Sequence, residues 1–506
     1  MTAARRKARS AQAQTAAAHA PTATTTILAR QAIMNDRETV IFTHLRNGFD
    51  RGISRPLSWR AYQLDSMARM VRDNAERITR AVHADMGKPP AETVLMEIDM
   101  LMHEIRFVKP RMRMWAARHH KAAPILMQPA RTWTHARPQG VVLVISPWNY
   151  PLLLSLQPMV DAIAAGNCVC LKPSELAPQT SRLLAELVPR YLDPRAVAVV
   201  EGDAGTATRL LSQSFDHVFY TGSGRVGKIV MHAAAEHLTP VTLELGGKSP
   251  VFVDGSTNVR VAARRIAWGR FINAGQTCVA PDYVLATPDV ADELTKEIGR
   301  AIRMFFGADP RASSSYARII NVRQFDRLVG LLPRAEGSGT PGKPKPQEGC
   351  GRIAFGGSHD RDDLYVEPTV LTEVDPDSAV MREEIFGPIL PVLTIPDAVR
   401  AARFINSRPH PLSTYVFSRN PRTRALFEDS VATGALGFGL PLGHLASSRL
   451  PFSGMKDSGL GTYHGKAGFL EFSHVTSVTS KPGVPDTLRI AYPPYTDPKR
   501  RLFRLL

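Results

Sequence analysis

The chain has 506 residues, of which 44% are hydrophobic and 22% are charged, as expected for a soluble globular protein of two or three domains. Its 63 basic and 46 acidic side chains give a formal net charge of +17, concentrated toward the two ends. Basic and aromatic residues are not interleaved as they are where bases stack, so no nucleic-acid partner is expected. No apolar run approaches the roughly 20 residues of a transmembrane helix.

The four cysteines exclude a disulfide framework and do not have the spacing of a zinc site, which predicts a reducing, cytoplasmic location and no metal. Residues 1–26 are basic and contain no acid, and they are predicted to be a disordered tail. Residues 335–351 are rich in Gly, Pro and Lys and predict an exposed, mobile loop. Residues 481–506 form a basic C-terminal tail.

Long helical patterns come first in the ordered part, over residues 58–85 and 92–119. Short apolar runs of strand length then alternate with helical segments, at 141–146, 168–172, 197–200 and 217–221. Buried strands that alternate with helices indicate a doubly wound parallel sheet, because each crossover needs its own helix. From residue 241 onward strands and helices alternate again, which predicts a second α/β domain.

The stretch "YTGSGRVGK" (220–228) places Gly222, Gly224 and Gly227 at the G-x-G-x-x-G spacing of a dinucleotide fingerprint. Glu244 follows about 20 residues later, where such a unit has its ribose-binding acid. Glu244 also lies in an apolar run before two glycines, where a carboxylate is costly unless it is paired or functional. The residues alone therefore leave two interpretations of this acid.

Cys278 stands among small and polar residues in "FINAGQTCVAPDYV" (271–284). A lone free cysteine is more often a small buried residue than a nucleophile. Two other stretches favour chemistry, because "PWNYP" (147–151) offers an amide at a strand end and "LELGGKSP" (243–250) offers a carboxylate. Together they provide a nucleophile, a hydrogen-bond donor and a base.

These stretches, with "LQPMVDAIAAGN", "EEIFGP" and "YHG" in the same order, resemble the NAD(P)-dependent aldehyde dehydrogenase superfamily, and most closely its class 3 branch of fatty, aromatic and coniferyl aldehyde enzymes. The resemblance runs from about residue 30 to about residue 475. It implies that Cys278 is the nucleophile, Asn149 the oxyanion donor and Glu244 the general base. The implied reaction oxidises an apolar or aromatic aldehyde, such as a coniferyl aldehyde-like compound, to its carboxylate through a thiohemiacetal and a thioester.

The resemblance also implies a cofactor site for NAD, with NADP as an alternative. Glu175 then replaces Glu244 as the ribose acid, because a carboxylate accepts from a 2′-hydroxyl and repels a 2′-phosphate. Ser174 and Glu175 are otherwise an ordinary helix N-terminus. The expected cofactor residues are Trp148, Lys172, Ser174, Glu175, Gly222, Ser223, Gly227, Glu384 and Phe386. Gly224 departs from the family pattern, which has a threonine there, and "FGL" (438–440) replaces a "V-N-D" segment near the substrate funnel.

The implied fold has a doubly wound cofactor-binding domain, an α/β catalytic domain and a small β oligomerisation flap. We assign the cofactor-binding domain to 27–127 and 141–245, the catalytic domain to 246–440, and the flap to 128–140 with 456–480. A homodimer is expected through this flap. Two alternatives stay open: an acylating or phosphorylating relative, which would often lack the base at Glu244, and a non-catalytic nucleotide-binding scaffold.

Overall fold

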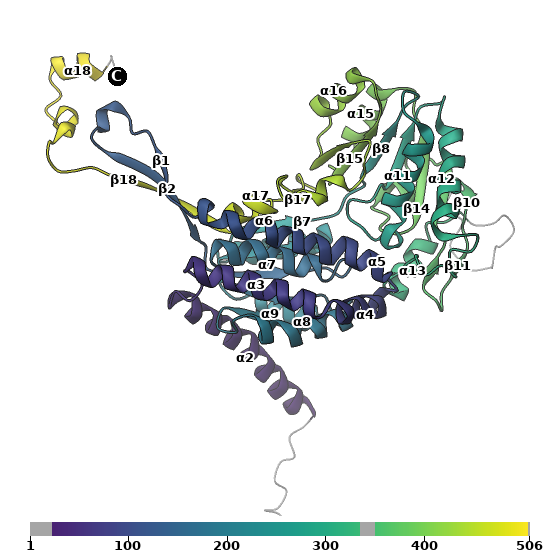
Figure 1. The fold of residues 1–506 in the computed structure, drawn as a ribbon, viewed down its shortest axis with the longest axis horizontal. Helices are drawn as coiled ribbons and strands as arrows, with labels where there is room; N and C mark the ends of the chain where they lie inside the picture. Colours follow the sequence, from purple (N-terminus) through teal and green to yellow (C-terminus); the bar gives the residue numbers. More distant parts are fainter. Residues whose placement is uncertain (1–22, 334–349, 504–506) are drawn as a thin grey trace, which may run out of the picture.

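The computed structural model describes residues 23–333 and 350–503. It contains two large sheets covered by helices and a long two-armed flap that projects from one side (Figure 1). Helix α2 (Ala23–Asp50) begins before the predicted start of ordered chain near residue 27. Most of the predicted N-terminal tail and nearly all of the predicted 335–351 loop lie outside the described residues.

The first large sheet has the strand order β17-β7-β6-β3-β4-β5. Its five parallel strands lie where the apolar runs predict them, and all but the edge strand β5 are buried at their centre: β3 (Val141–Ile145), β4 (Cys168–Lys172), β5 (Val197–Val199), β6 (His217–Thr221) and β7 (Val241–Glu244). The linking helices are α7 (Leu153–Ala165), α8 (Pro178–Tyr191), α9 (Ala204–Leu211) and α10 (Gly224–Ala235). This is the expected doubly wound sheet.

The region before this sheet forms more and shorter helices than the two long ones that the hydrophobic pattern predicts. Residues 58–85 form two helices, α3 (Leu57–Asp73) and α4 (Ala75–Met86), which meet at Asn74. Asn74 is buried and its side-chain amide donates to the Met70 carbonyl at 2.9 Å. A side chain that bonds to the preceding turn favours such a break. Downstream, α5 (Pro90–Thr93), a π-helical turn (Val94–Ile98) and α6 (Asp99–Trp115) follow one another.

The second large sheet has the order β10-β13-β14-β9-β8-β15-β16. Every neighbouring pair is parallel except β10 with β13. Its strands are β8 (Pro250–Val253), β9 (Tyr283–Ala286), β10 (Arg352–Phe355), β13 (Thr369–Thr372), β14 (Ile389–Thr394), β15 (Ser413–Phe417) and β16 (Ala435–Phe438). Helices α11 (Val259–Phe271), α12 (Ala291–Phe306), α13 (Val322–Val329), α15 (Ala398–Asn406) and α16 (Pro421–Ser430) accompany it.

The flap is a three-stranded antiparallel sheet of β1 (His119–Lys121), β2 (Arg131–Pro138) and β18 (Ser473–Ser480). The predicted boundaries differ at two places. β1 comes from a segment assigned to the cofactor-binding domain, and residues 456–472 belong to the body: β17 (Gly459–Leu460) pairs with β7, and α17 (Gly465–Glu471) packs on α7. The alternation of polar and apolar residues identifies a strand but not the sheet that it joins.

The C-terminal segment runs along the flap and away from the body (Figure 1). It contains a short 3-10 helix (Thr487–Ala491) and α18 (Asp497–Phe503). Lys481 fastens its start to the flap by donating to the carbonyls of Met127 and Gln128 at 3.1 and 3.0 Å. In the described part of the chain no helix is both long and apolar enough to cross a bilayer.

Asn167 ties the base of the flap to the body. Its side chain is fully buried, accepts from the Gly140 amide at 2.9 Å, and donates to the carbonyls of Ala162 and Phe472 at 3.0 and 2.9 Å. The three partners lie at the β2–β3 turn, on α7 and at the end of α17. One amide thus satisfies backbone groups from three separate segments.

We expect Asn167→Leu to lower the free energy of unfolding by about 2–4 kcal/mol, because it leaves the Gly140 amide and the Phe472 carbonyl buried without a partner. Denaturant unfolding measures the change. Gln128→Leu is the control, since it removes an exposed amide that donates only to the Ala123 carbonyl at 3.2 Å, and it should shift stability by less than about 0.5 kcal/mol. Equal effects of the two substitutions would contradict this role of Asn167.

Candidate active site

Cys278 lies at the end of a sharp turn between α11 and β9. After α11 a 3-10 segment (Ile272–Gly275) contains two residues with positive φ, Asn273 at 53° and Ala274 at 50°. At Gly275 a Cβ atom would stand 2.3 Å from the Gly387 carbonyl oxygen, so only glycine fits there. The turn therefore places the half-buried Cys278 thiol against the segment "EEIFGP".

Burial, with smaller contributions from the nearby carboxyl groups of Glu384 and Glu244, raises the pKa of Cys278 to about 12, against opposing contributions from the backbone amides of Cys278 and Val279. The groups of the chain itself thus keep this thiol protonated. A cationic group beside the sulfur would lower its pKa and make it a nucleophile.

Asn149 follows β3 and faces the Cys278 loop. Its side chain is 3% exposed, and its amide nitrogen donates to the Gln276 carbonyl at 3.1 Å. Its backbone carbonyl accepts from two side chains, Lys88 at 2.8 Å and Asn273 at 2.9 Å. Hydrogen bonds of both its side chain and its backbone therefore fix Asn149 beside the loop that carries Cys278.

A buried ion pair that sequence reasoning missed supports this turn. The Lys88 ammonium and the Glu97 carboxylate are 2.7 Å apart and neither side chain is exposed. The second Glu97 oxygen accepts from the backbone amides of Leu152 and Leu153, at 2.9 and 3.2 Å, where α7 begins. An acid within the apolar stretch 94–102 is the sequence signal that could have indicated it.

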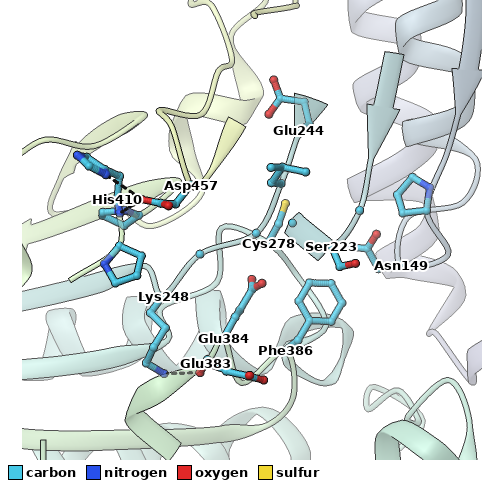
Figure 2. Close-up of a pocket in the computed structure, with 18 of the residues that line it drawn as sticks. Asn149, Ser223, Glu244, Lys248, Cys278, Glu383, Glu384, Phe386, His410 and Asp457 are labelled. Carbon is cyan, nitrogen blue, oxygen red and sulfur yellow. Dashed lines mark hydrogen bonds and ion pairs between the residues drawn. The ribbon is translucent and has the colours of Figure 1, made fainter. Parts of the chain in front are cut away.

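Glu244 ends β7 and is 2% exposed. Neither of its carboxylate oxygens has a hydrogen-bond partner among the described residues. Burial raises its pKa well above the usual range, and the charge of Glu471 adds to this. Figure 2 shows the Cys278 thiol between Glu244 on one side and Glu384 with Phe386 on the other. A desolvated, unpaired carboxyl group near a thiol has the properties of a general base.

Two cavities meet at the thiol. A cleft of about 480 Å³ is lined by residues from both large-sheet domains, and a second cavity of about 40 Å³, called the tunnel below, adjoins it. The residues that line both are Leu154, Thr221, Glu244, Leu245 and Cys278. The tunnel is otherwise mainly apolar, with side chains such as Met96, Met100, Leu445 and Phe452. Cys278 and Glu244 can therefore face both a ligand in the cleft and a second one in the tunnel.

The cleft gathers most of the expected cofactor residues, namely Trp148, Gly222, Ser223, Glu384 and Phe386. The Trp148 and Phe386 rings make an edge contact, with centroids 5.3 Å apart. Burial and the charge of Asp282 raise the pKa of Glu384 to about 8. A Cβ atom at Gly246 would stand 1.9 Å from a Glu384 oxygen, so the glycine leaves room for this carboxylate.

The other expected cofactor residues do not line this cleft. Lys172 ends β4, and Ser174 and Glu175 follow it at the same carboxyl edge of the sheet. Lys172 is buried and pairs with the half-exposed Glu175 carboxylate at 2.5 Å. Gly227 is buried on α10, where a Cβ atom would come within 2.8 Å of Leu245. Its role here is close packing of helix on strand.

The start of α10 is suited to a phosphate group. Ser223 is the N-cap residue, and a Cβ atom at Gly224 would have no atom within 4 Å. A helix N-terminus that faces open space binds anions through its free amide groups. This end of α10, the carboxyl edge of a parallel sheet and the large cleft together fit a dinucleotide.

Asp282 organises the segment that carries Glu384, a role that sequence reasoning also missed. Its carboxylate binds Arg270 at 3.0 Å and Lys248 at 2.5 Å, and it accepts from the Ile385 amide at 3.1 Å. Lys248 also donates to the Glu383 carbonyl at 3.0 Å; Figure 2 shows this contact at the rim of the cleft. Lys248, the lysine of "LELGGKSP", therefore connects the Asp282 carboxylate to the backbone just before Glu384.

The segment "FGL" (438–440) lies outside both cavities. Arg265 donates to the Gly439 carbonyl at 2.6 Å, and Leu440 is 47% exposed. The tunnel wall on this side is formed by Leu412, Leu445 and Phe452 instead. The departure of "FGL" from the family pattern therefore does not add polar groups to the tunnel lining.

Comparisons with known proteins agree with this geometry. The aldehyde dehydrogenase family model matches residues 6–478. Aldehyde dehydrogenase family 3 member A2 of Mus musculus is 42% identical over 90% of this chain and 91% of its own length. Family 3 member H1 of Arabidopsis thaliana is 42% identical over 92% of this chain and 94% of its own length.

Among solved structures, AldH of Staphylococcus aureus in a substrate-bound state superposes with a TM-score of 0.87 at 37% identity, covering 92% of this chain and 98% of its own. The chain belongs to the aldehyde dehydrogenase family, and the predicted resemblance to its class 3 branch is confirmed. The protein is an NAD(P)-dependent enzyme that oxidises an aldehyde to its carboxylate. The predicted fold class is confirmed as well.

We expect Lys88→Met to lower the free energy of unfolding by about 3–5 kcal/mol, because it leaves the Glu97 charge buried without its partner. Lys88→Met combined with Glu97→Gln should be less destabilised than the single variant, since the glutamine oxygen can still accept from α7 while no charge is left unpaired. Thermal and denaturant unfolding of the wild type and the variants measure both effects. A double variant less stable than Lys88→Met would contradict this account.

Proposed function

We propose that the substrate is an apolar or aromatic aldehyde, coniferyl aldehyde-like compounds included, and that Cys278, Asn149 and Glu244 carry out its oxidation. The observation that carries this proposal is the position of Cys278 and Glu244 at the junction of a large cleft and a narrow, mainly apolar tunnel. The mainly apolar lining favours an apolar aldehyde there, because the burial of apolar surface is favourable.

In the proposed mechanism the ionised Cys278 sulfur forms a bond to the carbonyl carbon of the aldehyde. The carbonyl oxygen becomes an alkoxide, which needs donors that are already in place. The Asn149 side-chain amide and the backbone amide of Cys278 supply them. Asn149 has one further N–H bond beyond the one that it gives to the Gln276 carbonyl.

When bound, the nicotinamide of NAD(P) supplies the hydride acceptor. We propose that Glu384 and Phe386 hold its ribose and ring, that Gly222, Ser223 and the start of α10 hold the pyrophosphate, and that Lys172, Ser174 and Glu175 hold the adenosine ribose. Trp148 would complete the wall of the cleft, and Gly227 would keep α10 close to the sheet.

NAD is the preferred cofactor in this proposal, because the Glu175 carboxylate repels a 2′-phosphate. The "dimeric NADP-preferring" aldehyde dehydrogenase of Mus musculus, 42% identical over 86% of this chain and 92% of its own, shows that a similar chain has the opposite preference.

The thioester left on Cys278 is hydrolysed by a water molecule that gives its proton to Glu244. A carboxyl group with a raised pKa accepts a proton more readily than an exposed one. An acylating or phosphorylating enzyme needs no such base, so Glu244 favours water as the final nucleophile. The buried, unpaired state of its carboxylate is the observation that supports this choice.

We further propose a cytoplasmic homodimer that associates through the flap, with the domain boundaries as predicted except for β1 and residues 456–472. Among the strands of the described residues β18 pairs with β2 alone, so its outer edge is available to another strand. The name of the NADP-preferring relative also includes the word dimeric. A dimer in light scattering at micromolar concentration is expected, and a monomer would contradict the proposal.

Two substitutions separate the two halves of the reaction. Cys278→Ala should reduce kcat/KM for every aldehyde by at least about 1000-fold, because no covalent step remains. Glu244→Gln should still release reduced nicotinamide in one rapid turnover and then stop, because hydrolysis of the thioester is blocked. Stopped-flow absorbance records both, and cofactor binding should be unchanged in Glu244→Gln.

The pH dependence of the second half has a defined direction. Glu244 accepts a proton only when ionised, and its pKa is raised by burial. Thioester hydrolysis should therefore accelerate as pH rises from 6 to 9, and in Glu244→Gln the residual rate should lose this dependence. Full steady-state activity of Cys278→Ala or of Glu244→Gln would overturn the assignments.

A further inference from the structure

Two carboxyl groups are buried against one another outside the cleft and the tunnel. Glu104 on α6 is 1% exposed, and Asp161 on α7 is fully buried. Their side chains are hydrogen-bonded to one another. In the part of the chain that the structure describes, neither forms an ion pair with a lysine or an arginine. Two carboxyl groups in one buried site disfavour the ionisation of both, because like charges repel and burial removes the water that would solvate them.

The donors around this pair leave one oxygen without a partner. The backbone amide of Gly465 donates to Glu104 at 2.6 Å, and that of His464 donates to Oδ2 of Asp161 at 3.2 Å. The other Asp161 oxygen, Oδ1, is buried, and no N–H or hydroxyl group of the described residues donates to it. A protonated carboxyl group can donate to a carboxylate. One proton held by the pair therefore supplies the missing hydrogen bond.

The electrostatics agree with this count of donors. Burial is the main cause that raises the pKa of both carboxyl groups, and the charge of Glu104 raises the pKa of Asp161 further. Asp161 is raised well above its usual range, so its carboxyl group keeps the proton and donates to Glu104. The exposed His103 on α6 has a smaller, opposite effect on the pKa of Glu104.

The other titratable groups near the pair do not compensate its charge. Burial lowers the pKa of His464 to about 3 and that of His444 to about 4, and it raises the pKa of Tyr463 well above its usual range, so all three are neutral. Asp99 and Arg106, which line an outer chamber with Glu104, are exposed. The remaining charged groups around α6 and α7 have partners of their own, namely Arg60 with the Ala164 carbonyl, Asp65 with Lys109, Glu97 with Lys88, and Arg449 with the Phe107 ring.

The pair holds the turn at which α17 begins. His464 and Gly465 have φ angles of 79° and 52°, a backbone conformation that a residue other than glycine keeps only where its surroundings fix it. At Gly468 a Cβ atom would stand 2.0 Å from Oδ2 of Asp161, so the glycine lets the first turn of α17 approach α7. The two amide hydrogen bonds thus tie this turn to α6 and α7 together.

We propose that Glu104 and Asp161 share one proton and, in this singly charged state, form a proton-dependent clamp that holds the turn 463–465 against α6 and α7. The single negative charge accepts from the backbone amides and from the shared proton, whereas loss of this proton places two like charges in one buried site. Glu104 borders an outer chamber of about 430 Å³, through which the proton can exchange. Tyr463 and His464 of the clamped turn line the tunnel beside Glu244, so the shape of this wall depends on the proton.

The direction of the pH effect follows from the proton that the folded protein keeps. In the unfolded chain both carboxyl groups ionise near their usual pKa of about 4. Above this pH the folded pair binds one proton more than the unfolded chain does. The unfolding equilibrium constant should therefore rise by about 10-fold per pH unit through this pair, until the folded pair also loses its proton at the raised pKa.

The test compares denaturant unfolding of the wild type and Asp161→Asn from pH 5 to pH 7. The asparagine amide donates to Glu104 at every pH, so the variant needs no shared proton. The unfolding constant of the wild type, divided by that of the variant, should rise about 100-fold over these two pH units, because the titration of all other groups cancels in the ratio. Glu104→Gln, whose amide can donate to Asp161, should give the same rise.

Asp85→Asn is the matched control. Both Asp85 oxygens already accept from backbone amides, those of Gln179 and Thr180 at 2.9 Å, so this carboxylate needs no proton and the ratio for the control should stay constant with pH. If Asp161→Asn does not fold, the ratio for Glu104→Gln decides the question. A ratio that does not rise with pH for these amide variants, or an equal rise for Asp85→Asn, would overturn the inference.

Discussion

The hydrogen bond from the Asn149 side chain to the Gln276 carbonyl is the contact on which the site depends. Asn149 belongs to the turn after β3 in the first sheet, and Gln276 to the loop before β9 in the second. Asn273 donates to the carbonyls of both residues, at 2.9 and 3.1 Å, and the buried Lys88 holds the Asn149 carbonyl from the other side. Two independently built sheets thus present an amide and a thiol to one point, where a displacement of about 1 Å would be costly in rate.

The electrostatics of the site follow from burial. Three acidic groups around the cleft and tunnel, Cys278, Glu244 and Glu384, have raised pKa values because desolvation disfavours their charged forms, and each of the carboxyl groups adds to the shift of the thiol. In this environment the neutral thiol of Cys278 is favoured over its thiolate. A positive charge in the cleft would lower the pKa of this thiol, so the ionisation of Cys278 depends on what occupies the cleft.

Much of the fold was predictable, because buried parallel strands leave unbroken apolar runs such as "VVLVI" and "CVCLK". Cys278, Asn149 and Glu244 could be singled out because each residue type is unusual in its setting. The break at Asn74, the course of residues 456–472 and the Lys88–Glu97 pair could not be, since they depend on contacts between distant segments.

The most direct test of the central claim, a covalent acyl group on Cys278, is mass spectrometry of Glu244→Gln after incubation with an aldehyde and NAD. The account predicts that the intact protein gains the mass of one acyl group, and that the group maps to the peptide that contains Cys278. An unmodified protein that has nevertheless produced one equivalent of reduced cofactor, or an acyl group on another residue, would contradict it.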